Sequence, residues 1–262
     1  VVIFLDILGS KEMKSFEEKY RIHEIFHQSI QESQERQYTD AKKHVVYDRK
    51  LFSFSDCAYI FYKYNVDIEE SKKDLDKLLQ TALFNTSLIT LKLLNEGYLI
   101  RGGVTYGEAY YDDMSFFGPA VEEAYLIESQ RALTPRVMID PQYGEKLLKF
   151  EKETYENVFD PNLPHYHRLP KRSYIPTIVI SDSDDFILNY LYILEMEGNI
   201  NLGESNISHN QIKKNIGKSI SNKLKKHIKN QNITKKLKWM ENYNNFSKLS
   251  LVNSTHGITY LV

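Results

Sequence analysis

Two aspartates stand where short apolar runs end, and their carboxylates are the first candidates for chemistry. Asp6 follows the apolar run of residues 1–5 and precedes the turn Leu8–Ser10. Asp56 lies in the pair Ser55-Asp56 between two β-prone runs, so we predict a tight hairpin with Asp56 at its tip. Because an unpaired carboxylate is costly to bury, Asp6 is either a metal ligand at a strand end or a cap of the following turn.

A second carboxylate beside Asp6 favours the metal interpretation. If their strands are neighbours, Asp6 and Asp56 can share two divalent cations. Hard ions such as Mg²⁺ and Mn²⁺ prefer carboxylate oxygens and substrate phosphates. Phosphoryl transfer uses such a pair of ions, because the attacking and the leaving oxygen both carry charge.

Two further features of the sequence suit a polyphosphate. The turn formed by Leu8, Gly9 and Ser10 leads into a predicted helix, so its backbone N–H groups could face phosphate oxygens. Arg101 precedes a pair of glycines, and its planar guanidinium could bind the same phosphates. A structural ion pair is the alternative role for Arg101.

Alternating strand and helix patterns must position these residues. The predicted elements are a strand within 1–10, a helix at 12–37, a hairpin at 44–63, a helix at 69–96, two strands at 98–111, a helix at 119–132, a strand at 135–139 and a short helix from Pro141. This order predicts an α+β sheet covered by helices.

The pattern weakens after about residue 150, so we divide the chain into a core (1–150) and a C-terminal extension (151–262). The extension is predicted to hold a loop at 152–175, a hairpin at 177–188, a polar stretch at 198–210, a lysine-rich helix at 213–229, a last helix at 237–246 and a strand at 256–262. Isoleucines recur every four residues on the lysine-rich helix, which favours a docked helix with a solvated basic face.

Composition excludes several classes of protein. The 262 residues are 42% hydrophobic and 26% charged with a formal net charge of −1, which gives no general attraction to nucleic acid or membrane. No apolar run approaches the roughly 20 residues of a membrane span. One cysteine allows no intrachain disulfide, so we expect a cytoplasmic protein. The chain begins inside a predicted strand without Met, and we expect a few residues to precede it.

Four segments, in order across about residues 1–140, resemble class III nucleotidyl cyclases. Phe4–Ser10 is similar to their metal-binding strand and turn, and Phe54–Tyr59 to their second metal-ligand hairpin. Ile100–Gly107 resembles the next glycine-rich strand, and Phe117–Ala124 the opening of the following helix. The Ser-Asp hairpin, the Arg-Gly-Gly strand and the Ala-Tyr-Leu-Ile-Glu helix look like bacterial pyrimidine cyclases of Pycsar anti-phage systems.

The resemblance implies a palm-like (ferredoxin-like), antiparallel-rich sheet flanked by helices. It also implies a homodimer with active sites at the interface, and conversion of UTP or CTP to the 3′,5′-cyclic monophosphate and pyrophosphate, with UTP favoured. A separate effector would read the product as an alarm signal.

Site residues carry over from the resemblance one by one. Asp6 and Asp56 match the catalytic metal ligands for two Mg²⁺ or Mn²⁺ ions, and the carbonyl of Ile7 is a further ligand. Arg101 matches an arginine that binds the triphosphate together with the turn.

Base-binding positions separate this chain from purine cyclases. Phe52 falls where those enzymes place a base-reading lysine. An aromatic ring there could stack on a pyrimidine, and the alternative is a core residue, since aromatic side chains on strands are usually core. Ser115 falls where adenylyl cyclases tend to have a base-contacting aspartate. Glu122 and Leu126 replace the expected transition-state asparagine and arginine. The alternatives are therefore a purine cyclase with an unusual pocket, or a catalytically inactive cyclase fold that senses nucleotide.

Overall fold

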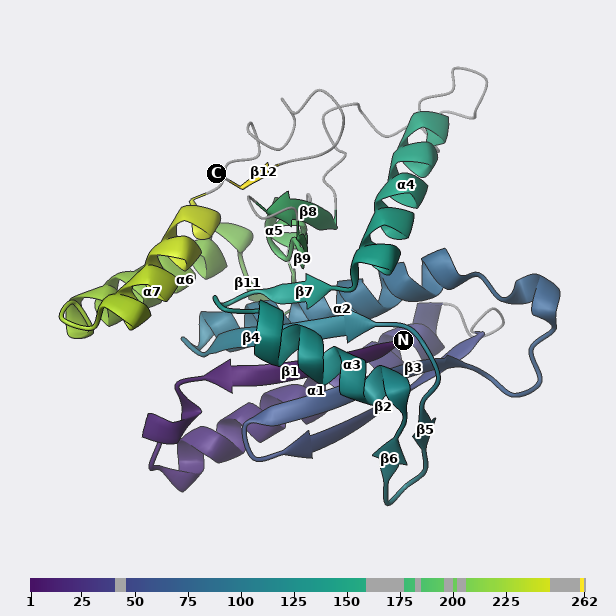
Figure 1. Ribbon diagram of the computed structural model, residues 1–262, viewed down its shortest axis with the longest axis horizontal. Helices are drawn as coiled ribbons and strands as arrows, with labels where there is room; N and C mark the ends of the chain where they lie inside the picture. The colour runs from purple at the N-terminus through teal and green to yellow at the C-terminus, as the bar shows by residue number, and fades with distance from the viewer. Residues whose placement is uncertain are drawn as a thin grey trace.

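The computed structural model describes residues 1–40, 46–158, 177–181, 185–195, 200–201, 206–245 and 260–261. Helices flank a mixed β-sheet in an α+β arrangement, which confirms the predicted fold class at this level (Figure 1). Among these residues no helix is both long enough and apolar enough to span a membrane.

The first half of the chain builds a β-α-β-β-α-β unit. Its elements are β1 (Val2–Leu8), α1 (Phe16–Asp40), β2 (Tyr47–Phe54), β3 (Cys57–Tyr64), α2 (Leu75–Asn95) and β4 (Leu99–Thr105). The strands lie in the order β4-β1-β3-β2, and each neighbouring pair is antiparallel. The strand that carries Asp6 therefore lies between β3 and β4.

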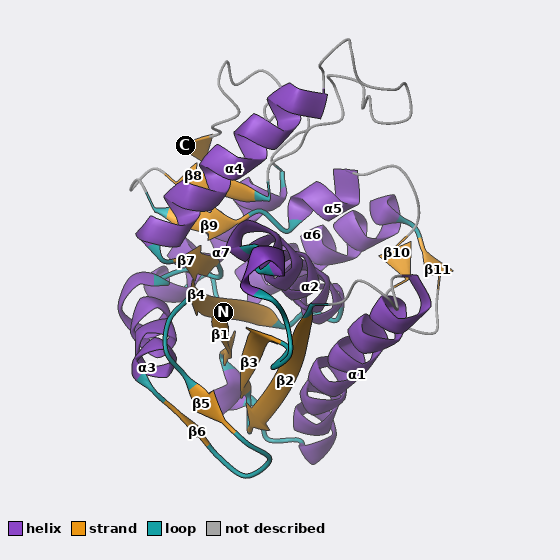
Figure 2. Cartoon of the chain, turned by 90° about the vertical axis from the view of Figure 1, so that its right-hand side faces the viewer, coloured by secondary structure: helices purple, strands orange, loops and turns teal. Residues whose placement is uncertain are grey.

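Residues of β1 alternate between two buried faces of the sheet. Ile3, Leu5 and Ile7 pack in the core that residues of α1 and α2 also form. Phe4 faces the opposite side, and Asp6 shares that side because side chains two residues apart point the same way. Figure 2 shows α1 on one side of the sheet and, on the other, α3 (Pro119–Leu126) with the hairpin of β5 (Tyr110–Tyr111) and β6 (Phe116–Phe117). Both faces are thus covered, but by different elements.

After β4, α3 and the β5–β6 hairpin cover the Asp6 side of the sheet, the next strand extends the sheet, and the helix after that strand packs with α2 on the opposite side. The elements of this segment are β5 (Tyr110–Tyr111), β6 (Phe116–Phe117), α3 (Pro119–Leu126), a π-helical turn (Ile127–Arg131), β7 (Val137–Ile139) and α4 (Pro141–Val158). Among the described strands β5 and β6 pair only with each other, and they form a projecting arm (Figure 1). α3 packs directly on β4, since a Cβ at Gly103 would collide with the carbonyl oxygen of Ala124.

Strands from the C-terminal part join the same sheet. The remaining elements are β8 (Ile178–Ser181), β9 (Phe186–Leu188), α5 (Leu191–Glu195), β10 (Ile200–Asn201), β11 (Asn206–Ile207), α6 (His209–Lys226), α7 (Gln231–Asn244) and β12 (Tyr260–Leu261). The whole sheet runs β12-β8-β9-β7-β4-β1-β3-β2, with the β4–β7 and β12–β8 pairs parallel. The residues of the C-terminal extension therefore enlarge the sheet of the core.

The lysine-rich helix docks as its isoleucine pattern predicts. Ile212, Ile216 and Ile220 on α6 are buried in a second hydrophobic cluster, which also contains Leu91 of α2. The side chain of Ser208 caps α6 by accepting a hydrogen bond from the Gln211 N–H at 3.3 Å. Four lysines of α6 are exposed, whereas Lys213 and Lys223 are partly buried.

Several boundaries differ from those that the sequence predicts. The helix from Pro141 is not short, because α4 continues to Val158 before the first proline of the following stretch and packs Leu147 and Phe150 on the core. The start of the predicted 152–175 loop is therefore helical, and residues 159–176 lie outside the described part. The pairing of β5 with β6 was not predicted. Of the predicted terminal strand 256–262, only residues 260–261 are described.

Candidate functional site

The Asp6 carboxylate lies between the two neighbours of β1. In the strand register Asp6 is opposite Cys57 of β3 and Arg101 of β4. Asp56 occupies the two-residue turn between β2 and β3, where Ser55 has a positive φ of 56°. The predicted hairpin is thereby confirmed, and its strand is a direct neighbour of the strand that carries Asp6.

A backbone hydrogen bond ties the hairpin tip to β1. The N–H of Ile7 donates to the carbonyl oxygen of Asp56 at 3.1 Å. The Ser10 hydroxyl, on the turn that follows β1, donates to Oδ2 of the same aspartate. Asp6 and Asp56 are therefore held together although the sequence separates them widely, so the structure brings these two predicted residues into one site.

Arg101 bridges two carboxylates. Its Nη2 lies 3.0 Å from Oδ2 of Asp6 and 2.6 Å from Oε1 of Glu128. Glu128 belongs to the π-helical turn after α3 and is only 2% exposed. The Nε–H of Arg101 is buried without a hydrogen-bond partner within the described residues. The single positive charge of the guanidinium is thus shared by the Asp6 and Glu128 carboxylates, and its Nε–H remains an unused donor.

The two aspartates have pKa values shifted in opposite directions. Burial raises the pKa of Asp6, the Arg101 guanidinium opposes this rise, and the negative charge of Asp56 adds to it. Burial would also raise the pKa of Asp56, but hydrogen bonds from Ser10 and Ser55 outweigh it and lower that pKa. A cation beside both carboxylates would relieve the repulsion that Asp6 experiences.

The oxygen donors of this site suit a Mg²⁺ or Mn²⁺ ion that is shared with a substrate. The protein would supply the carboxylates of Asp6 and Asp56 and the carbonyl of Ile7. Among the described residues no group of three or more His, Cys, Asp or Glu side chains could hold a metal ion. Mg²⁺ is commonly bound by one or two carboxylates plus phosphate oxygens and water, rather than by a full protein cage. The residues present fit that mode.

The turn after β1 has the backbone conformation that a glycine allows. Gly9 has a φ of 83° and precedes a short 3-10 turn, Ser10–Glu12. A Cβ at Gly9 would meet no atom within 4 Å, so open space lies beside this backbone. Leu8 and Gly9 line a cavity, whereas Ser10 is buried against Asp56. The predicted phosphate-binding turn therefore lies next to the two carboxylates.

Phe52 belongs to a packed aromatic cluster on the Asp6 side of the sheet. This aromatic cluster consists of Phe4, Phe52, Tyr59, Phe61, Tyr111 and Phe116. The Phe52 ring lies 4.9 Å from that of Phe116 and is half-buried. Part of its surface serves the packing of the β5–β6 arm, as expected for an aromatic residue on a strand, and the remainder is open to solvent.

Ser115 lies in the exposed turn of the β5–β6 arm. Its N–H donates to Oδ1 of Asp112 at 2.7 Å, and its hydroxyl is 3.3 Å from the same oxygen. These contacts stabilise the turn. Among the hydrogen bonds of the described residues, Ser115 makes none with another predicted site residue. Its neighbour in the arm, Phe116, contacts the Phe52 ring.

Glu128 is the member of the site that sequence reasoning missed. Glu128 is the last residue of the Ala-Tyr-Leu-Ile-Glu motif. Its place in this cyclase-like motif is the one sequence feature that could have marked it as a site residue. The preceding helix exposes Glu122 and Leu126 to solvent. Within the described structure these two side chains do not take part in the Asp6–Arg101–Glu128 contacts.

Comparisons with protein-family models, with curated proteins and with solved structures find no match to this chain.

Proposed function

We propose that this chain is a nucleotidyl cyclase that converts a pyrimidine nucleoside triphosphate, UTP or CTP, to the 3′,5′-cyclic monophosphate and pyrophosphate. The observation that carries this proposal is the junction of Asp6 and Asp56, made by the hydrogen bond from Ile7 to the Asp56 carbonyl. Two carboxylates at one end of a central strand, next to a glycine turn and an arginine, suit two-ion phosphoryl chemistry.

The topology supports the same proposal. A β-α-β-β-α-β order with strands arranged β4-β1-β3-β2 is consistent with the palm-like, ferredoxin-like fold that the cyclase resemblance implies. Many unrelated functions share this architecture, so the topology alone does not identify a reaction. The placement of Asp6 and Asp56 within it is the more specific argument.

Two divalent cations, held by Asp6, Asp56 and the Ile7 carbonyl, would supply charge stabilisation for the attacking and leaving oxygens. The chain itself positions the substrate. Ring closure joins the ribose 3′-oxygen to the α-phosphorus of one molecule, so correct orientation can supply much of the rate. Arg101 would exchange the Asp6 carboxylate for a phosphate oxygen, and the N–H groups of the turn at Gly9 and Ser10 would face the triphosphate.

Base selection would depend on the aromatic cluster. The half-buried Phe52 ring offers a face for stacking and no hydrogen bond that reads adenine. Whether Ser115 contacts the base would depend on where the β5–β6 arm lies relative to the bound nucleotide. A pocket of this kind discriminates mainly by size, which suits a pyrimidine better than a purine.

Exposed apolar side chains support a homodimer. Phe54 is 80% exposed at the hairpin tip, and Phe117, Tyr125 and Leu126 are exposed on β6 and α3. They belong to elements around the aromatic cluster, and apolar surface of this kind favours association with a partner. We propose that a second copy of the chain covers this face, and that the cyclic product is read by a separate effector in anti-phage defence.

A catalytically inactive cyclase fold that senses nucleotide is the second candidate. Glu122 and Leu126 favour it, because both side chains are solvent-exposed and neither can supply the amide or guanidinium of the resembled enzymes. Retention of both Asp6 and Asp56 favours the active enzyme.

Asparagine substitutions test the roles of the two carboxylates. Asp6→Asn and Asp56→Asn should each lower the rate of cyclic nucleotide formation about a thousandfold, equivalent to about 4 kcal/mol of transition-state stabilisation. Asp67→Asn, at an exposed carboxylate after β3, is the matched control and should retain full activity. Folded Asp6→Asn and Asp56→Asn proteins with undiminished cyclisation would overturn the proposal.

A further inference from the structure

A cavity of about 720 Å³ lies between the sheet and the two C-terminal helices. The turn after β1 forms one wall through Leu8 and Gly9, and the segment Asn95–Leu99 between α2 and β4 forms another. Residues of α6 and α7 close the remaining side, where Figure 1 places these helices near the carboxyl end of β1. Its volume is within the range of about 300–1,000 Å³ that small-molecule sites occupy.

Four lysines from α6 and α7 line this cavity. They are Lys218, Lys223, Lys226 and Lys236. None of the four forms an ion pair within the described part of the chain, whereas lysines elsewhere, such as Lys73, Lys77 and Lys92, each pair with a carboxylate. Cationic side chains from two helices thus converge on one space without an ion-pair partner among the described residues.

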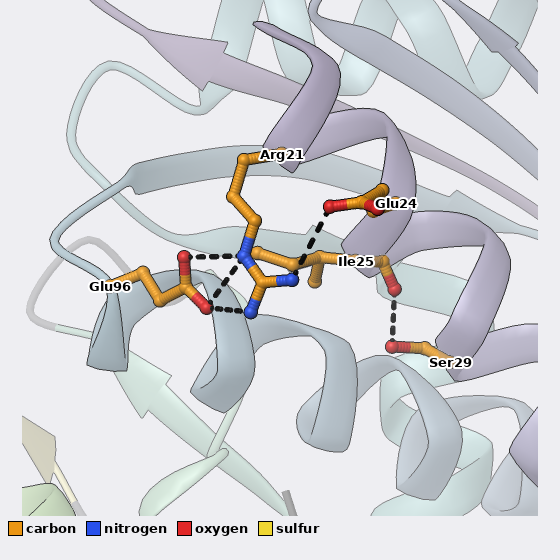
Figure 3. A network of polar contacts seen from close by, with 5 residues as sticks. All are labelled: Arg21, Glu24, Ile25, Ser29 and Glu96. Atoms are coloured by element: carbon orange, nitrogen blue, oxygen red, sulfur yellow. Dashed lines mark hydrogen bonds and ion pairs between the residues drawn. The ribbon is translucent and has the colours of Figure 1, made fainter. Parts of the chain in front are cut away.

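The acidic residues of the cavity do not balance these lysines. Glu96 is already held by Arg21, whose Nε lies 3.0 Å and 2.9 Å from its two carboxylate oxygens, as Figure 3 shows. Glu12 and Glu18 remain, and they act favourably on Lys223. Even so, burial and the neighbouring Lys226 lower the pKa of Lys223. With four lysines and only Glu12 and Glu18 left to balance them, the described lining carries an excess of positive charge.

Neutral polar groups complete the lining. Asn215, Ser219, Asn222 and His227 of the α6 region contribute to the walls. The amide of Asn215 donates to Oδ1 of Asn95 at 3.0 Å and anchors α6 to the end of α2. The α6 backbone that carries three of the four lysines is consequently anchored to the end of α2, next to the segment Asn95–Leu99 that lines the cavity.

We propose that this cavity binds a small phosphate-bearing anion at a site that shares the turn at Gly9 with the Asp6–Asp56 pair but does not use those two carboxylates. Lysine ammonium groups bind phosphate as point charges, and the polar side chains can donate to its remaining oxygens. Walls on several sides and the acidic Glu12 and Glu18 suit a compact ligand better than an extended nucleic acid strand. The inference does not depend on the proposed cyclase activity.

Binding of inorganic tripolyphosphate, measured by calorimetry in EDTA at about 0.15 M salt, tests the proposal. The wild-type chain should bind one tripolyphosphate per protomer. Replacing Lys218, Lys223 and Lys226 with glutamine should weaken binding at least about tenfold. The matched control replaces Lys214 and Lys225 of α6 and Lys238 of α7 with glutamine. These lysines do not line the cavity, and their replacement removes the same amount of charge.

The outcomes separate a built site from general electrostatic attraction. The control triple should change the affinity less than about threefold, since screened surface charges contribute little. Arginine at the same three cavity positions should retain binding, and circular dichroism should give the same fold for every variant. No binding to wild type, or equal losses in the cavity and control triples, would overturn the proposal. The double variant Asp6→Asn/Asp56→Asn should still bind tripolyphosphate in EDTA. Loss of this binding would also overturn the proposal, because it would place the anion at the Asp6–Asp56 site.

Discussion

Removal of the Arg101 guanidinium should destabilise the protein, because two carboxylates depend on it. Arg101→Met keeps an unbranched apolar stem and deletes only the charged fork. In the native structure Nη2 of Arg101 contacts Asp6 at 3.0 Å and Glu128 at 2.6 Å. Glu128 is 2% exposed, so after the substitution its carboxylate would stay buried without a cation.

The size of the loss follows from the burial of these groups. Breaking a buried ion pair by removal of one partner costs about 3–5 kcal/mol. The side chains of Arg101 and Asp6 are 21% and 23% exposed, so we expect the lower end, about 3 kcal/mol. Arg21→Met is the matched control, because Arg21 and Glu96 are 43% and 30% exposed and their pair should contribute about 1 kcal/mol or less.

The loss should also depend on pH. Burial raises the pKa of Asp6 and of Glu128, and Arg101 lowers both, so its removal raises both further. An acid whose pKa is raised by folding stabilises the native state below its unfolded pKa, and this contribution disappears as the pH rises through the folded pKa. The deficit of Arg101→Met should therefore be largest at neutral pH and shrink as both carboxyls become protonated on acidification.

Urea unfolding followed by circular dichroism measures these effects at about pH 7 and about pH 4.5. The double variant Arg101→Met/Glu128→Met should regain part of the lost stability at neutral pH, because an apolar pair replaces the buried Arg101–Glu128 pair at little cost while Asp6 still lacks its cation. A deficit no larger than that of Arg21→Met, or one that is independent of pH, would refute this reasoning. A double variant as unstable as the single one would do the same.

Three other variants probe neighbouring features. Gly103→Ala places a methyl group against the Ala124 carbonyl and should lower stability by about 1–3 kcal/mol in thermal unfolding; an unchanged midpoint would contradict the close packing of α3 on β4. Ser10→Ala removes a hydrogen bond that lowers the pKa of Asp56, so NMR titration should find that pKa raised; no rise would exclude the hydroxyl as its cause. Phe54→Glu should weaken a homodimer in light scattering, and a wild-type monomer would contradict the dimer.

Local patterns predicted the parts of the site that depend on adjacent residues. Ser55-Asp56 is a turn-favouring pair between β-prone runs, so the hairpin could be located without knowledge of the fold. The apolar run before Asp6 likewise marked β1. The metal hypothesis had to assume that these two strands are neighbours. The structure shows that β3 pairs with β1.

Tertiary packing decided what the sequence did not predict. Glu128 has no local feature that distinguishes it from an exposed helical glutamate, and it is buried because the π-helical turn places it against Arg101. β5 and β6 have two residues each, too few for a periodic pattern. The cavity lysines looked like a solvated helix face, and their convergence depends on how α6 and α7 pack against the turn at Gly9.

Our proposal for this chain is that the Asp6–Asp56 site closes a pyrimidine nucleotide into a ring. Its most direct test incubates the purified protein separately with UTP, CTP, ATP and GTP in Mg²⁺ or Mn²⁺ and identifies the products by mass spectrometry. We expect cyclic UMP or cyclic CMP together with pyrophosphate, and little or no cyclic purine nucleotide. Exclusive turnover of ATP or GTP would contradict the assigned substrate class, and the absence of every cyclic product from a folded dimer would contradict the cyclase itself.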